Sequence, residues 1–289
     1  MTTNKNTLEH IIHGIFLLMG LVAVGCVLLI TVYLVISGIP AILEIGLIDF
    51  LFGKEWASTA TDPKYGIWAF ILTSIYGTAG AIVIGVPIGF MTAVYLSKIA
   101  SPKVKSMMQS AVSLLAGIPS VVYGLVGMLV LVPGIRKIFG VPDGASLLAA
   151  IIVLAIMILP SIIKMSITAL DAVPKEYEDA SLALGATPIE TYFKVSVPAA
   201  KSGIAAAVVL GVGRAIGEAM AVMMVAGNVP NMPDSIFQSV RFLTTAVSSE
   251  MAYSSGLQQQ ALFSIALVLF LFIMLINATL NFFLKRETE

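Results

Sequence analysis

Charged side chains are scarce in this sequence. Only 11% of its 289 residues are Asp, Glu, Lys or Arg, whereas 58% are hydrophobic. A soluble domain of this length has too little interior to remove that much apolar surface from water. The formal net charge is zero, which gives no electrostatic reason to expect a nucleic-acid partner. The composition therefore indicates an integral membrane protein.

Cysteine and histidine are also rare, with one and two copies. The single cysteine, Cys26, lies in an apolar run and has no second cysteine with which to form a disulfide. The apolar runs contain no paired His, Cys or Asp residues, so we expect neither a metal, nor a cofactor, nor a catalytic site. The sequence also lacks a G-x-x-x-x-G-K-[ST] phosphate loop. An enzyme is therefore the least favoured interpretation.

Six apolar runs are long enough to cross the hydrocarbon layer, which takes about 20 residues of helix. We predict an all-α membrane protein with one transmembrane permease domain over 1–289 and six spans, at about 14–40, 66–97, 107–134, 145–170, 203–227 and 260–284. The first span is too long for the apolar core of a signal peptide and is expected to be retained. Pro87, Pro119 and Pro160 interrupt three of the runs, either as packing kinks or as bends that line a pathway.

Basic residues set the expected orientation. With the N-terminus in the cytoplasm, ten Lys and Arg fall on inner segments and five on outer ones, while Arg214 lies within a span. This excess predicts that both termini are cytoplasmic. The segment 41–65 is then external and is expected to form a short interfacial helix with Trp56 at the headgroup level. The segment 228–260 is expected to be an external loop.

The cytoplasmic segment 171–201 carries helix start and stop signals. Pro174 suits the start of a helix, and Gly185 suits its end. The stretch Thr187-Pro188-Ile189-Glu190 then fits a capping box that opens a second helix, ending near Pro198. We therefore expect two short helices joined by a sharp turn. An ordered loop of this kind is either a plain connection or a docking element.

The same loop resembles the EAA loop of ABC-importer permeases. The matching residues are Asp179, Ala180, Ser181 and Gly185, followed by Val195, Val197 and Pro198, with Glu178 directly before them. The departures from the family pattern are Asp for Glu, Ser for Ala, and Val for Ile and Leu. The resemblance implies a MetI-like type I permease fold. It also implies a coupling helix that docks on a separate ATPase subunit, so that this chain hydrolyses no ATP itself.

Two charges stand in the middle of the fifth span, in GRAIGEAMAVMMVAGN. Arg214 and Glu218 are four residues apart, so on one helix they can face each other. A pair is less costly in the membrane than a bare arginine. The pair is either a static packing contact or a gate that releases the arginine to an anion.

Three stretches resemble the PstC/PstA family of phosphate-specific permeases, its PstC branch in particular. They are YGIWAFILTSIYGTAGAIVIGVPIG, LLAGIPSVVYGLVGM and GRAIGEAMAVMMVAGN. The resemblance implies an inner-membrane phosphate importer with a PstA-like second permease, a dimer of PstB-like ATP-binding subunits and a PstS-like extracytoplasmic phosphate-binding protein. The candidate residues for the phosphate pathway are Arg214, Glu218, Thr73, Ser74, Thr78, Ser120 and Tyr123. For the five uncharged residues, a helix-packing contact is the favoured interpretation.

Two alternatives remain at this point. The first is a permease of the same family for another oxyanion or small solute, in which the external loops carry the difference. A stand-alone secondary transporter is a more remote alternative, because it does not need the loop pattern from Asp179 to Pro198.

Overall fold

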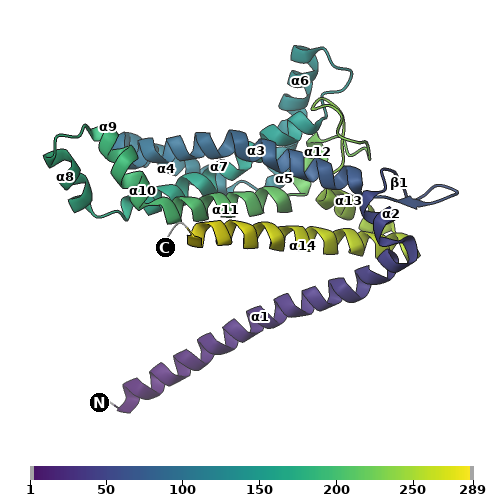
Figure 1. Cartoon of the computed structure of the whole chain (residues 1–289), viewed down its shortest axis with the longest axis horizontal. Coiled ribbons are helices and arrows are strands. Elements are labelled where there is room, and N and C mark those ends of the chain that lie inside the picture. The colour runs from purple at the N-terminus through teal and green to yellow at the C-terminus, as the bar shows by residue number, and fades with distance from the viewer. Residues whose placement is uncertain (1–2, 287–289) are drawn as a thin grey trace.

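The computed structural model describes residues 3–286 and consists almost entirely of helices (Figure 1). Its long helices are α1 (Thr3–Ile45), α3 (Trp68–Val94), α7 (Leu147–Asp171) and α14 (Gly256–Arg286), and a π-helical turn, η1 (Tyr95–Ile99), extends α3. In the described part of the chain, five helices are long and apolar enough to cross a membrane, or six if one bent pair counts as a span. The all-α membrane fold is therefore confirmed. Pro87 and Pro160 lie inside α3 and α7 without ending either helix.

The third predicted span is wrong as a single helix. The chain forms α4 (Pro102–Gly117), then leaves helical geometry at Ile118 and Pro119. It continues as α5 (Ser120–Val126), the π-helical turn η2 (Gly127–Leu131) and α6 (Val132–Phe139), which together form the apolar helix 120–139. The break follows from Pro119, which has no amide hydrogen and disfavours helical geometry at the residue before it.

The fifth predicted span is also broken. Helix α11 (Lys201–Gly217) ends where Glu218 becomes extended, with φ −74° and ψ 127°, and α12 (Met220–Val225) follows. Before α11, the loop helices α8 (Lys175–Ala183), α9 (Pro188–Thr191) and α10 (Val197–Ala199) flank the π-helical turn η3 (Tyr192–Ser196). The segment 188–199 meets α11 at an angle of 71°.

Small residues let α3 lie directly against α7, with which it shares the centre of the molecule (Figure 1). A Cβ atom at Gly85 would lie 2.7 Å from Ile158 Cδ1 and 3.1 Å from the Ala155 carbonyl oxygen. Glycine at such positions allows the backbones to approach closely, which is the usual way in which membrane helices pack. The two helices therefore form a rigid pair on which the other elements rest.

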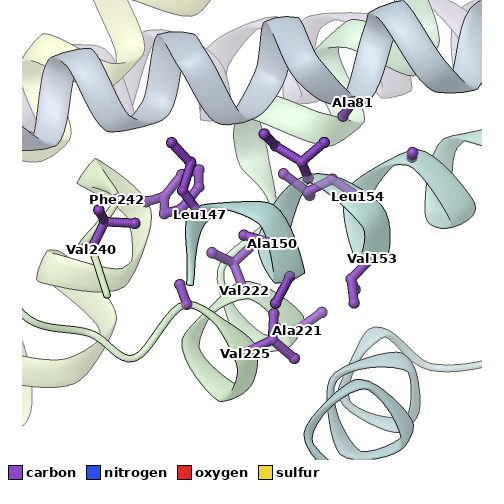
Figure 2. Close-up of a cluster of buried hydrophobic side chains, with 14 of the residues drawn as sticks. Ala81, Leu147, Ala150, Val153, Leu154, Ala221, Val222, Val225, Val240 and Phe242 are labelled. Atoms are coloured by element: carbon purple, nitrogen blue, oxygen red, sulfur yellow. The ribbon is translucent and has the colours of Figure 1, made fainter. Parts of the chain in front are cut away.

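The core beside this pair gathers buried apolar side chains from α3, α6, α7, α12 and the segment 240–242, and Figure 2 shows part of it. Leu147 and Leu154 of α7 meet Val222 and Val225 of α12, and Phe242 comes from the segment before α13 (Leu243–Glu250). The broken fifth span is thus anchored by its second half, because α12 is buried in this cluster. The first half, α11, is left to line a cavity.

The end of the molecule opposite α8 and α9 is more ordered than the sequence suggested (Figure 1). The segment 41–65 contains α2 (Leu47–Phe52) and a two-stranded hairpin of β1 (Trp56–Ala57) and β2 (Lys64–Tyr65). Trp56 is buried and its Nε1 donates to Glu250, so its side chain packs inside the protein, and its level relative to the headgroups stays a prediction. The expected loop 228–260 contains α13 and a 3-10 turn, η4 (Met251–Tyr253), because its apolar residues pack inward.

Helix α1 leaves the body of the molecule and approaches it only near its C-terminal end (Figure 1). There Ser264 Oγ of α14 donates to the Gly38 carbonyl oxygen at 2.5 Å. The large apolar side chains between Ile12 and Leu43 are mostly exposed. An apolar surface of this extent is not sustained in water, which agrees with a membrane environment.

Candidate coupling loop and substrate cavity

The turn after α8 is a Schellman motif. Gly185 has φ +88°, and its amide donates to the Leu182 carbonyl oxygen at 3.0 Å. The next amide, of Ala186, donates to the Ser181 carbonyl oxygen at 3.3 Å. These two bonds satisfy carbonyl groups that the end of a helix leaves unpaired. The prediction that Gly185 ends the first loop helix is confirmed.

The second loop helix begins with the predicted capping box. Thr187 Oγ1 accepts from the Glu190 amide, and the Glu190 carboxylate accepts from the Thr187 amide and hydroxyl. The bonds from the Thr187 backbone and side chain, with that from Lys194 and its charge, lower the pKa of Glu190 to about 2. Glu190 is therefore ionised at physiological pH and holds the start of α9.

The loop presents apolar side chains to the outside. Leu184 is 90% exposed and Ile189 is 64% exposed, and Asp179 and Ala180 are exposed beside them. Ser181 turns inward, and its hydroxyl lies 2.9 Å from that of Thr191. Helix α8 itself has no buried residue. A helix of this kind, held at a sharp angle with uncovered leucine and isoleucine nearby, has the form of a docking surface.

The remaining residues of the loop pattern lie farther along it. Val195 and Val197 are half-buried, and Pro198 is exposed at the start of α10. Val195 lies in η3, and Val197 and Pro198 lie in α10, directly before the bend that leads into α11. Any movement of the loop therefore reaches α11 through this short connection.

Glu178 faces the protein instead of solvent. Its Oε1 lies 2.6 Å from Lys98 Nζ and accepts from Ser196 Oγ at 2.8 Å. Burial alone would raise the pKa of Glu178, but the hydrogen bonds from Lys98 and Ser196 and the charges of Lys98 and Lys175 lower it. The carboxylate is thus held ionised at the inner side of the loop. Lys98 carried no signal in the sequence, because its partner lies far along the chain.

Arg214 lines a cavity of about 790 Å³ on α11. Its Nη1 donates to Ser161 Oγ of α7 at 3.4 Å, and Asn277 of α14 completes the polar part of the lining. The other lining residues are apolar or small. Among residues 3–286, no carboxylate lies within 4 Å of the Arg214 guanidinium. The site is therefore a half-buried cation with neutral polar neighbours.

The predicted ion pair between Arg214 and Glu218 is wrong. Because α11 ends at Gly217, Glu218 is not one helical turn above Arg214. The Glu218 carboxylate instead accepts a hydrogen bond from the Ala221 amide at 3.0 Å, and the backbone carbonyl oxygen of Glu218 accepts one from Thr244 Oγ1 at 2.9 Å. Glu218 thus satisfies the start of α12, where a carboxylate is favoured by the helix dipole.

The other pathway candidates do not line the Arg214 cavity. Thr73 and Ser74 are buried on α3, where Ser74 Oγ accepts from the Leu243 amide at 3.0 Å. Thr78 lines a separate cavity of about 310 Å³ between α3, α11 and α14. The Ser74 bond joins α3 to the start of α13, whereas the buried Thr73 hydroxyl has no hydrogen-bond partner among the described residues.

The two candidates beside Pro119 are also apart from that cavity. Ser120 is half-buried at the start of α5. Tyr123 donates from its hydroxyl to the Leu115 carbonyl oxygen at 2.8 Å, which satisfies the end of α4 across the break. Ser161 and Asn277, which line the cavity with Arg214, lie on two different helices and belong to no motif, so no sequence pattern marks them.

The structure thus combines a bundle of apolar helices, an ordered loop with exposed apolar side chains and a cavity lined by an arginine. The chain matches the family model described as "Binding-protein-dependent transport system inner membrane component" over residues 85–287. The chain therefore belongs to this family of inner-membrane permeases.

Several curated relatives agree with the family. The chain is 41% identical to the probable ABC transporter permease protein YqgH of Bacillus subtilis, over 89% of this chain and 86% of the relative. It is 33% identical to the phosphate transport system permease protein PstC of Pasteurella multocida, over 77% and 75%. The corresponding protein of Haemophilus influenzae is 34% identical over 77% and 76%.

Solved structures show the same fold. A chain of the inward-facing MetNI methionine ABC transporter aligns with a TM-score of 0.58 at 22% identity, covering 78% of this chain and 95% of that chain. A chain of a bacterial alginate ABC transporter aligns with a TM-score of 0.62 at 16% identity, covering 95% and 94%. The protein is thus a multi-pass inner-membrane permease subunit of an ABC importer with the MetI-like type I fold. Its relatives are permease subunits rather than enzymes.

Proposed function

We propose that this chain forms the phosphate pathway of an ATP-driven importer together with a second, PstA-like permease subunit. Several relatives that are about a third identical over most of the chain are named as phosphate transport permeases, PstC. The YqgH relative carries no substrate in its name. The choice of phosphate therefore depends on the chemistry of the cavity as well.

The observation that carries the proposal is the Arg214 cavity. Arginine stays charged at any physiological pH, and its planar guanidinium offers parallel N–H donors to two oxygens of one anion. A charge at membrane depth is costly unless it is compensated. No carboxylate of residues 3–286 compensates Arg214, so an anion in the cavity would lower the free energy of the site.

The neighbours of Arg214 suit an oxyanion better than a cation or an apolar solute. Ser161 contributes a hydroxyl and Asn277 an amide, each of which can donate a hydrogen bond to phosphate oxygen. Both groups can also accept, which fits the proton that phosphate still carries near neutral pH. The cavity lies among α7, α11 and α14, where a second permease can complete it.

The loop at 171–201 supplies the coupling to ATP in this proposal. Its exposed Leu184 and Ile189 would dock on a dimer of PstB-like ATP-binding subunits, with Asp179, Ala180 and Ser181 in the contacting helix. The loop and both termini would then be cytoplasmic, which agrees with the distribution of basic residues. The opposite end, with α2, α13 and the hairpin, would receive a PstS-like phosphate-binding protein.

Uptake of labelled phosphate by cells that depend on this chain tests the proposal. Arg214→Gln should abolish uptake while the protein still reaches the membrane and still co-purifies with the ATP-binding subunit. Arg214→Lys should keep part of the uptake, because it keeps the charge and loses the planar fork. A matched control is Arg136→Gln, which removes an exposed arginine from α6. Wild-type uptake by Arg214→Gln would exclude Arg214 from the pathway.

A permease for another oxyanion is the competing function, since a guanidinium binds any tetrahedral oxyanion. Excess unlabelled sulfate or arsenate in the same assay separates the two. Competition by arsenate alone fits a phosphate site, because arsenate matches phosphate in shape and protonation. Equal competition by sulfate points to a general oxyanion permease.

A further inference from the structure

A single polar cluster joins the proposed coupling loop to the membrane helices. Lys98 lies in η1, at the end of α3, and its Nζ lies 2.6 Å from Glu178 Oε1 of α8. The same ammonium donates to the Leu170 carbonyl oxygen of α7 at 2.9 Å. Ser196 of η3 donates to Glu178 Oε1 at 2.8 Å. Four elements therefore meet at one carboxylate and one ammonium.

This cluster is the main inner attachment of α8. The helix has no buried residue, so apolar packing contributes little to its position. The Lys98 and Glu178 side chains are only 10% and 19% exposed, which shields their interaction from water and salt. Within residues 3–286, the other side-chain hydrogen bond of α8 joins Ser181 to Thr191 and stays within the loop.

The membrane side of the cluster leads to the cavity. Lys98 ends the helix that packs along α7 through Gly85, and it also bonds α7 directly through Leu170. Helix α7 carries Ser161, the hydrogen-bond partner of Arg214. A displacement of α8 can therefore reach the two central helices through this ion pair, in addition to the chain linker 172–174 that joins α7 to α8, and α7 lines the cavity.

We propose that Lys98 and Glu178 form a joint that passes movement of α8 to α3 and α7 and so couples ATP hydrolysis to opening of the pathway. The proposal rests on the proposed function, in which α8 docks on the ATPase. Glu178 then acts inside the permease, and the docking contacts belong to the exposed neighbours, Asp179 and Ala180. Lys98 is a positioning residue that touches neither substrate nor ATPase.

The test compares import with ATP hydrolysis in the reconstituted complex of both permeases, the ATP-binding dimer and the phosphate-binding protein. Lys98→Met removes the charge and keeps an unbranched side chain, whereas Lys98→Arg keeps the charge. The matched control is Lys105→Met, because Lys105 pairs with Asp171 at 2.9 Å and joins α4 to α7 without touching α8. We expect Lys98→Met to keep ATP hydrolysis while phosphate imported per ATP falls about tenfold, within the usual range for coupled sites.

Lys98→Arg and Lys105→Met should keep the wild-type ratio. A wild-type ratio in Lys98→Met overturns the proposal, and so does an equal fall in Lys105→Met, which would show a general loosening of this end. If Lys98→Met fails to assemble, Glu178→Gln replaces it, since glutamine has the same size and still accepts hydrogen bonds. The ratio must then fall in Glu178→Gln, and an unchanged ratio overturns the joint.

A second readout is independent of the substrate. Binding of the ATP-binding dimer should change hydrogen exchange in residues 95–99 of the wild-type protein and leave them unchanged in Lys98→Met. An exchange change that persists in Lys98→Met overturns the joint. Failure of the wild-type complex to import phosphate would instead overturn the proposed substrate, and the exchange result would still stand.

Discussion

Substituting Gly185 separates backbone strain from side-chain contact in the coupling loop. The residue has φ +88°, and within residues 3–286 no atom other than those of Gly185 and its two sequence neighbours lies within 4 Å of where its Cβ would be. The cost of a side chain is therefore conformational. An L-residue in left-handed geometry costs about 1–2 kcal/mol, and asparagine tolerates this geometry better than alanine. One to two kcal/mol lowers the population of the turn by about 5- to 30-fold.

Two variants follow from this magnitude. Gly185→Ala should reduce the protection of the Ala186 amide, which closes the Schellman motif, by about 5- to 30-fold in hydrogen exchange. Gly185→Asn should reduce it less, although asparagine is the larger side chain. Phosphate uptake should fall in the same order while the protein stays in the membrane. A larger effect of asparagine than of alanine would refute the reasoning, because it would show that size near Gly185 matters.

Three further substitutions test the packing, the outer end and the loop cap. Gly124→Ala should lower the free energy of unfolding by about 1–3 kcal/mol, because its Cβ would lie 2.8 Å from the α12 backbone. The unfolding temperature in detergent should therefore fall. Gly134→Ala, where the space around the Cβ is open, should leave that temperature unchanged. Glu250→Gln should lower the free energy of unfolding at the outer end by about 1–3 kcal/mol, since Arg241 loses its counter-charge. The loop before α13 should then become more sensitive to protease. The Glu190 cap should stabilise α9 fully above about pH 4.5, and this stabilisation should be lost as the pH falls through about 2, because the pKa of Glu190 is lowered from 4.5. At pH 3 the amides of α9 should therefore exchange faster in Glu190→Gln than in wild type. Equal exchange rates would contradict this.

The coupling loop was predictable because its signals are local. Gly185 ends a helix through its own backbone freedom, and the capping box depends on residues only three apart. The break at Pro119 is also indicated in the sequence by the proline itself, although the predicted third span runs across it. Local chemistry of this kind acts before tertiary contacts form, so a sequence pattern reports it well.

The break at Glu218 had no such mark. Nothing in the apolar run around it excludes a helix, and the break is maintained by distant contacts, such as the Thr244 hydroxyl on the Glu218 carbonyl oxygen. The same limit applies to the cavity. Arg214 was identifiable as a charge in an apolar run, but Ser161 and Asn277 become its neighbours only when three helices pack together. Side chains brought together by packing leave no spacing pattern in the sequence.

ATP-driven import by the reconstituted complex tests the central claim most directly. Proteoliposomes containing this chain and the three proposed partners would receive labelled phosphate or labelled sulfate outside and ATP at the side of the ATP-binding dimer. The account predicts ATP-dependent accumulation of phosphate, loss of that accumulation in Arg214→Gln, and no accumulation of sulfate. Accumulation of sulfate without phosphate, or full phosphate import by Arg214→Gln, would contradict it.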